Sequence, residues 1–197
     1  EIKNKIIELL DSTERKGIDK VIKFLESSDF FEAPASTRYH GNYKGGLAEH
    51  SLNVYEIFRR KNVEYDFGLS DDTVKITALL HDICKTNFYT VSSRNMKKDG
   101  KWIQVPYYAV DDQVPFGHGE KSVILLQQFI RLSKEEVIMI RWHMGGYEPS
   151  QNYNNVSNAW NICKAGVALH TADLESSYIL ETHFEPGEST KQMSFKA

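Results

Sequence analysis

The strongest constraint on the fold is an imidazole and a carboxylate placed inside an apolar segment. Residues 77–86 read TALLHDICKT, so His81 and Asp82 interrupt a run of mostly apolar side chains. Burying an unpaired charge is costly, and a buried carboxylate therefore needs a cation or strong hydrogen-bond donors beside it. Any fold of this chain must bring that partner to Asp82 from another segment.

Size and composition describe a globular protein without a general polyanion-binding surface. A length of 197 residues suits one domain, and an apolar share of 41% is enough for a core. The net charge of −3 gives no overall basic field of the kind that a dedicated duplex-binding protein carries. Any basic patch would have to be local.

The cysteines and the hydropathy pattern predict a cytoplasmic protein that makes no contact with a membrane. Cys84 and Cys163 are isolated and have apolar neighbours, which suits a reducing compartment. No stretch of about 18 apolar residues is present that would span a bilayer. The charged segment 1–10 also has no signal-peptide core.

Apolar side chains recur at helical spacing over most of the chain. Ser70 and Ser133 stand where they would cap helix N-termini, and acidic residues follow Ser70 directly. The pattern predicts helices over residues 1–10, 16–27, 46–61, 70–85, 118–131, 133–144 and 156–181. The fold class is therefore expected to be all-α.

One segment, near residues 87–110, departs from the helical pattern. Tyrosine, valine, tryptophan and isoleucine flank Asp99-Gly100, a dipeptide typical of tight β-hairpin turns. We therefore expect a helical bundle with a small inserted β-hairpin.

The chain is expected to form one domain over residues 1–197. Its core would cover about 40–181, with N-terminal helices in 1–28 packed on it. The last segment, 182–197, lacks a clear pattern and is expected to be a tail.

Histidine and aspartate residues recur on the expected helices, or at their starts, in apolar or glycine-rich contexts. Successive settings are separated by 31, 36, 25 and 30 residues, about one helix and one connection each. The helices of a bundle can each deliver one side chain to a common point, as in metal sites built inside helical bundles. The residues concerned are His50, His81, Asp82, His118, His143 and Asp173.

A single histidine on an apolar helix face is more often a core residue than a ligand. That explanation weakens when it must hold at five places, and it leaves Asp82 and Asp173 without a partner. A divalent metal would supply the positive charge that both carboxylates need. His170, three residues before Asp173, is either a supporting or a core residue, and His183 fits no pattern. His40, in a glycine-flanked loop, is a candidate substrate contact.

The ordered pattern H…HD…H…H…D resembles the HD-domain superfamily of metal-dependent phosphohydrolases. Lys85 strengthens the resemblance, because HDICK matches the HD-x-x-K form of the motif. The resemblance covers about residues 40–180 and implies an all-helical HD-domain bundle. It implies one metal held by His50, His81, Asp82 and Asp173, and a second held with His118 and His143, with Asp82 bridging the two.

The resemblance therefore implies one or two divalent transition metals as cofactors. Four imidazoles and two carboxylates favour Mn²⁺, Fe²⁺, Co²⁺, Ni²⁺ or Zn²⁺ over Mg²⁺, which prefers oxygen ligands. Two such ions can activate a bridging water for attack on phosphorus. Asp82 and Lys85 are the catalytic candidates, and Lys85 follows His81 by about one helical turn, within reach of a phosphate.

The predicted function is hydrolysis of a phosphoester in a nucleotide or a short single-stranded nucleic acid. A small nucleotide is the preferred candidate substrate, because no added nucleic-acid-binding domain is visible in the sequence. The GYP tripeptide of the cyclic-di-GMP phosphodiesterase branch is also missing from MGGYEPS. Two other functions stay open: a diiron oxygenase that uses the same six ligands, and a non-catalytic, metal-stabilised module that binds a nucleotide.

The hairpin carries further candidate substrate contacts. Arg94, Lys101 and Trp102 combine cations with an aromatic face, which suits phosphates and a base that can stack. A solvated hairpin whose lysines protect its edges is an equally open interpretation. The sequence does not indicate the oligomeric state.

Overall fold

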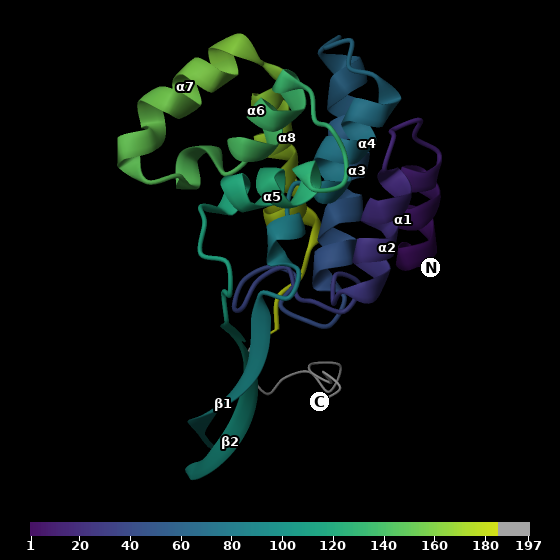
Figure 1. Cartoon of the computed structure of the whole chain (residues 1–197). Helices are drawn as coiled ribbons and strands as arrows, with labels where there is room; N and C mark the ends of the chain where they lie inside the picture. The colour runs from purple at the N-terminus through teal and green to yellow at the C-terminus, as the bar shows by residue number, and fades with distance from the viewer. Residues whose placement is uncertain (185–197) are drawn as a thin grey trace.

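A computed structural model describes residues 1–184, which are helical apart from one β-hairpin (Figure 1). The helices are α1 (Ile2–Asp11), α2 (Ile18–Ser27), α3 (Gly46–Glu64), α4 (Asp71–Leu80), α5 (His118–Gln127), α6 (Lys134–Arg141), α7 (Tyr153–Ile162) and α8 (Ala165–Glu175). The strands are β1 (Tyr89–Lys98) and β2 (Lys101–Val110). Short 3₁₀ turns cover Ile83–Lys85, Gly145–Tyr147 and Ser150–Asn152, and a π-helical turn, Ser176–Leu180, follows α8. The predicted fold class, an all-α bundle with a small inserted hairpin, is confirmed.

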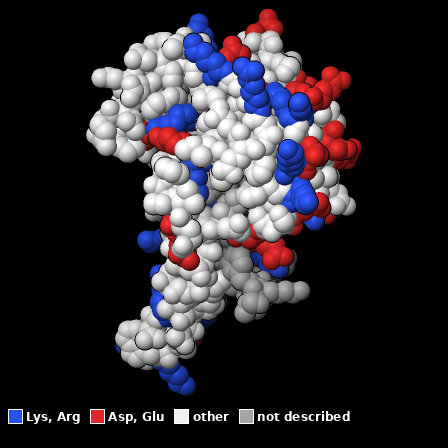
Figure 2. Space-filling model, in the orientation of Figure 1, with Lys and Arg blue, Asp and Glu red and all other residues white. Residues whose placement is uncertain are grey.

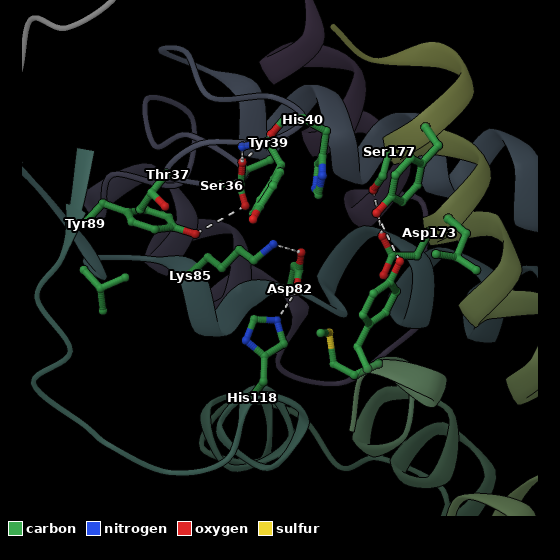
Figure 3. A pocket seen from close by; sticks show the side chains of 16 residues that line it. Ser36, Thr37, Tyr39, His40, Asp82, Lys85, Tyr89, His118, Asp173 and Ser177 are labelled. Carbon is green, nitrogen blue, oxygen red and sulfur yellow. Dashed lines mark hydrogen bonds and ion pairs between the residues drawn. The ribbon is translucent and has the colours of Figure 1, made fainter. Parts of the chain in front are cut away.

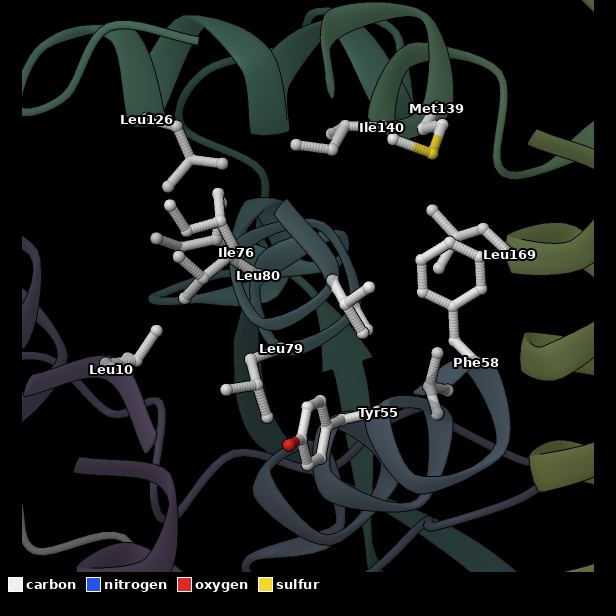
Figure 4. Packing of buried hydrophobic residues seen from close by; sticks show 14 of the residues in the cluster. Leu10, Tyr55, Phe58, Ile76, Leu79, Leu80, Leu126, Met139, Ile140 and Leu169 are labelled. Atoms are coloured by element: carbon white, nitrogen blue, oxygen red, sulfur yellow. The ribbon is translucent and has the colours of Figure 1, made fainter. Parts of the chain in front are cut away.

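Helix α4 lies at the centre of the apolar core. Every residue from Val74 to Leu80 is buried, and α4 contacts α1, α3 and α6. Figure 4 shows apolar side chains from α1, α3, α5, α6 and α8 around it. Because this helix is enclosed on all sides, the residues that follow its last turn also enter the interior.

Among the described helices, none has the length and apolarity needed to cross a bilayer.

The N-terminal helices share this core. Ile6 and Leu10 of α1, and Val21 and Leu25 of α2, are fully buried in the same apolar cluster. Helix α1 contacts both α3 and α4. The division of the chain into a core and appended helices stays a prediction, and most of the expected tail, residues 185–197, lies outside the described part.

Two predicted helix starts are confirmed. Ser70 Oγ accepts a hydrogen bond from the Thr73 amide at 3.2 Å. Ser133 forms a reciprocal capping box with Glu136 at the start of α6. Each cap pairs a backbone N–H that the helix itself leaves without an acceptor.

The predicted hairpin turn is also confirmed. Lys98 pairs with Lys101 across Asp99-Gly100, whose φ angles of 51° and 80° are both positive, as a type I′ turn requires. The strands project away from the helices (Figure 1), and most of their side chains are exposed. The buried residues of the strands are Val105 and Tyr108.

Two predicted helices are interrupted at points that the apolar periodicity did not predict. The helix expected over 70–85 ends at Leu80, and Asp82 has left helical backbone geometry (φ −103°, ψ 18°). The helix expected over 156–181 is divided at Cys163 (φ −130°, ψ 89°) into α7 and α8. The prediction was wrong at both points because apolar residues continue through each break.

Candidate metal centre

The break after α4 turns the His-Asp pair towards the centre of the molecule. His81 follows the last residue of α4, and Asp82 stands at the turn before the short helix Ile83–Lys85. The two residues are 0% and 2% exposed, so their polar atoms must find partners inside the protein.

Each carboxylate oxygen of Asp82 faces a different pair of histidines. Oδ1 lies 2.7 Å from His118 Nε2 and 3.4 Å from His143 Nε2. Oδ2 lies 3.6 Å from Nε2 of both His50 and His81. Asp82 therefore stands between two pairs of nitrogen donors, where one carboxylate could contact two cations.

Asp173 of α8 and Glu181 complete the half of the site around His50. His50 Nε2 lies 3.3 Å from Asp173 Oδ1 and 3.2 Å from His81 Nε2, and His50 Nδ1 lies 2.8 Å from Glu181 Oε1. Burial alone would lower the pKa of His50, but hydrogen bonds to Asp173 and Glu181 outweigh it and raise the pKa to about 10. These carboxylates require a positive charge here, which a proton or a metal cation can supply.

Backbone hydrogen bonds determine which nitrogens of His81 and His143 point inward. His81 Nδ1 donates to the Ala78 carbonyl at 2.8 Å, and His143 Nδ1 donates to the Ile140 carbonyl at 2.7 Å. Their Nε2 atoms consequently face the centre, as in metal-ligating histidines. Burial lowers the pKa of His81 to about 4, so this imidazole is neutral at pH 7.

The donor set fits a divalent metal. His143 Nε2 is buried and has no hydrogen-bond partner among the described residues, a costly arrangement that a cation would relieve. Within each of three groups the possible ligand atoms lie no more than 4.8 Å apart: His50 with His81 and Asp173, His81 with Asp82 and His143, and Asp82 with Cys84 and His118. These groups contain all six predicted ligands. Imidazole together with carboxylate suits a divalent transition metal.

Comparison with known proteins agrees with this geometry. A family model described as the HD domain matches residues 47–186. The chain belongs to the HD-domain family. The matched range contains every predicted ligand, from His50 to Asp173.

One curated relative matches part of this HD domain. A dihydroneopterin 2′,3′-cyclic phosphate phosphodiesterase from Methanocaldococcus jannaschii is 33% identical over 84 residues. The match covers 41% of this chain and 32% of the relative, so the chain spans about a third of the relative's length. No solved structure matches the chain significantly.

Two contacts position His118 and His143, the two histidines that face Asp82 Oδ1. Gly119 packs against α6 so closely that an added Cβ would lie 2.1 Å from the Arg141 carbonyl oxygen. The glycine thus lets α5 approach α6 and brings His118 near His143. His170 Nδ1 donates a hydrogen bond to the carbonyl of His143 at 2.7 Å. The buried His170 thus supports the position of His143.

Part of the candidate metal centre lines a pocket of about 560 Å³ (Figure 3), whereas His50, His81 and His143 are fully buried behind it. Asp82, His118 and Asp173 are exposed to it, together with Lys85 and His40. Lys85 Nζ lies 2.7 Å from Asp82 Oδ2. Burial would lower the pKa of Lys85, but the charge on Asp82 outweighs it and raises the pKa, so the ammonium stays charged. Burial lowers the pKa of His40 to about 4.

The other predicted substrate contacts lie on the hairpin. Arg94, Lys101 and Trp102 do not line this pocket. Trp102 is 72% exposed beside the turn, and Figure 2 shows basic side chains along the edge and at the tip of the projection. A contact between these residues and substrate stays a prediction.

Four residues join the site without having been expected. Glu181 contacts His50, as described above, and Cys84 Sγ lies 3.5 Å from both ring nitrogens of His118. The hydroxyls of Tyr147 and Tyr178 are 3.1 Å apart in the pocket lining. Helical spacing gave no signal for Glu181, because it stands in extended backbone after the π-helical turn that follows α8.

Proposed function

We propose that this protein is a metal-dependent phosphohydrolase that acts on a small phosphorylated substrate, with a nucleotide as the leading class. The position of Asp82 carries the proposal, because its two carboxylate oxygens face separate pairs of imidazoles and Asp82 itself lines the pocket. This arrangement matches sites in which two metal ions act on one phosphoryl group.

Each residue of the centre has a role in this proposal. His50, His81 and Asp173 would hold one divalent metal, His118 and His143 would hold a second, and Asp82, which lies between the two groups, would contact both. Bound ions of this type supply an activated water and neutralise charge on phosphoryl oxygens. Lys85 donates a hydrogen bond to a phosphoryl oxygen, since its ammonium is held in the pocket by Asp82.

The reaction adds water across a phosphoester bond. A hydroxide oxygen forms a new bond to phosphorus, and the bond between phosphorus and the ester oxygen breaks. The ester oxygen leaves with a proton as an alcohol. The phosphate remains on the other product.

The pocket supports a substrate with a planar ring. Its volume of about 560 Å³ lies within the usual range for small-molecule sites, and Tyr39, Tyr89, Tyr147 and Tyr178 contribute to its lining. Aromatic side chains offer faces for stacking and hydroxyls for hydrogen bonds. The name of the M. jannaschii relative includes a cyclic phosphodiester, which supports testing cyclic phosphodiesters as well.

The decisive experiment combines metal analysis with a substrate panel. Protein purified without chelators is assayed for bound metal, then reloaded anaerobically with Mn²⁺, Co²⁺, Ni²⁺ or Fe²⁺. Nucleoside monophosphates, cyclic nucleotides and short linear dinucleotides are offered in turn. We expect metal-dependent formation of inorganic phosphate from a monophosphate, of a ring-opened monophosphate from a cyclic nucleotide, or of a nucleoside and a nucleotide from a dinucleotide, in at least one class.

Other outcomes of the same experiment would favour one of the two alternative functions, a diiron oxygenase or a non-catalytic binding module. Oxygen consumption by the iron-loaded protein, without hydrolysis, would indicate a diiron oxygenase. Tight nucleotide binding with full metal occupancy and no turnover would indicate a binding module. A protein that binds no transition metal would remove the basis for all three functions.

A further inference from the structure

A second groove adjoins the pocket and has a different character. It has a volume of about 460 Å³ and is lined by the loop around Arg38 and by both strands of the hairpin. Thr37 and Val110 line the groove and the pocket alike, so the two spaces share a wall. The groove and the pocket therefore adjoin at these two residues.

Two arginines give the groove its charge. Arg38 comes from the loop that also carries His40, and Arg94 comes from β1. Neither guanidinium forms an ion pair with a carboxylate of residues 1–184, and none of the described residues that line the groove is acidic. Unpaired guanidinium groups are well suited to bind phosphate, because each offers several donors in one plane.

The groove also has an ordered wall. Asn42 accepts a hydrogen bond from the Phe184 amide at 2.9 Å and donates one to the Phe184 carbonyl at 2.7 Å. Arg94 lies over the ring of Tyr107, with its guanidinium carbon 5.5 Å from the ring centre. Tyr107 therefore orients Arg94 and adds an aromatic surface beside it.

We propose that this groove binds a second phosphoryl group of the substrate. The inference rests on the proposed function and narrows it to linear phosphodiesters with a further terminal phosphate, such as a 5′-phosphorylated dinucleotide. The scissile phosphate lies over Asp82 and Lys85, and the terminal phosphate lies between Arg38 and Arg94. A substrate with one phosphate reaches only the pocket.

The test compares two substrates with one pair of substitutions. The double variant Arg38→Gln/Arg94→Gln is assayed on a 5′-phosphorylated dinucleotide and on bis(p-nitrophenyl) phosphate, which has no second phosphate. We expect kcat/KM to fall at least about tenfold on the dinucleotide, as for lost charge-assisted hydrogen bonds, and by less than about twofold on the small diester. The matched control, Arg59→Gln/Arg60→Gln, removes two exposed arginines of α3 and should change neither rate.

Salt dependence and a conservative variant sharpen the result. The loss of two phosphate contacts should make dinucleotide binding less sensitive to salt, by roughly 0.7 in the logarithmic slope for each contact. Arg38→Lys/Arg94→Lys keeps both charges and should recover part of the dinucleotide rate. Equal losses on both substrates, or an unchanged dinucleotide rate, would overturn the proposal.

A binding measurement separates this proposal from the proposed function. Affinities for a 5′-phosphorylated dinucleotide with a non-hydrolysable phosphorothioate linkage and for AMP are measured by calorimetry. Tighter binding of the dinucleotide, lost in the glutamine double variant, would support the groove even if no substrate were hydrolysed. Equal affinities in wild type would contradict the groove, whatever the enzyme hydrolyses.

Discussion

The centre around Asp82 and the outer half of the hairpin are both rich in ionisable side chains, but their surroundings differ. At the centre, carboxylates, imidazoles and one ammonium lie within hydrogen-bond or ion-pair distance of one another, and most of them are buried. On the hairpin, Lys97, Lys98 and Lys101 are exposed around a protruding turn. Ionisable side chains are thus mostly buried at the centre and exposed at the hairpin turn.

This difference determines what each region can tolerate. A buried charge that loses its partner keeps its desolvation cost, whereas an exposed charge is simply hydrated by water. A hairpin of two strands is also only marginally stable without packing support. We therefore expect substitutions at the centre to have large effects and substitutions near the hairpin turn to have small ones.

The largest effect is expected from Asp82→Ala. This change removes both oxygens that face the histidine pairs, so metal occupancy should fall to near zero and turnover roughly a thousandfold or more. Metal analysis and the substrate assay measure the two losses, and a thermal melt confirms folding. Asp19→Ala, at the exposed start of α2, should behave as wild type. Activity of Asp82→Ala within about twofold of wild type would exclude the bridging role.

A buried charge elsewhere tests whether burial alone creates this sensitivity. Glu136 is fully buried and accepts hydrogen bonds from Arg15 at 2.6 and 2.9 Å and from Thr73 at 2.9 Å. Glu136→Ala should lower the free energy of unfolding by about 3–5 kcal/mol, because it leaves Arg15 without its partner. Denaturant unfolding measures the loss, and the exposed neighbour Glu135→Ala should change it by less than about 1 kcal/mol.

The pH dependence of the same contact follows from its pKa. Burial would raise the pKa of Glu136, but hydrogen bonds from Arg15 and the Ser133 amide outweigh it and lower the pKa below 4.5. The folded state therefore favours the ionised form. Its stabilisation is complete above about pH 4.5 and is lost as the pH falls through the lowered pKa. A difference between wild type and Glu136→Ala that does not shrink in acid would contradict this account.

Local signals explain which parts of the fold were predictable. Ser70, Ser133 and Asp99-Gly100 act through their own backbone neighbourhood, so the sequence identifies the caps and the turn they form. The clustering of the six proposed ligand residues was predictable for another reason: buried imidazoles and carboxylates conflict with an apolar core unless they meet.

The features that escaped prediction depend on packing between segments. The end of α4 at Leu80 and the break at Cys163 occur inside runs that remain apolar, so periodicity does not report them. Cys84 has apolar neighbours in the sequence, as a core residue would. It lies beside His118 only because α5 packs against this part of the chain. The direction of the hairpin, which carries Arg94 to a groove, is likewise a property of the assembled fold.

A smaller effect is expected one step outside the proposed ligands. Glu181→Gln removes the charge that faces His50 Nδ1 but keeps the shape of the side chain. Metal affinity, measured by competition with a chromophoric chelator, should weaken by about 10–100-fold, as for other groups that orient a ligating histidine. Glu175→Gln is the control, because Glu175 pairs with Lys61 away from the centre. Equal affinities of wild type and Glu181→Gln would show that Glu181 does not support His50.

The smallest effect is expected at the hairpin turn. Trp102 is 72% exposed, so Trp102→Ala should change the free energy of unfolding by less than about 0.5 kcal/mol. Tyr108 lies on the same strand but is 2% exposed, and Tyr108→Ala should cost about 3 kcal/mol. Denaturant unfolding compares the pair directly. A large loss from Trp102→Ala would mean that the turn packs against a partner in solution, and the contrast between centre and hairpin would then apply only to the isolated chain.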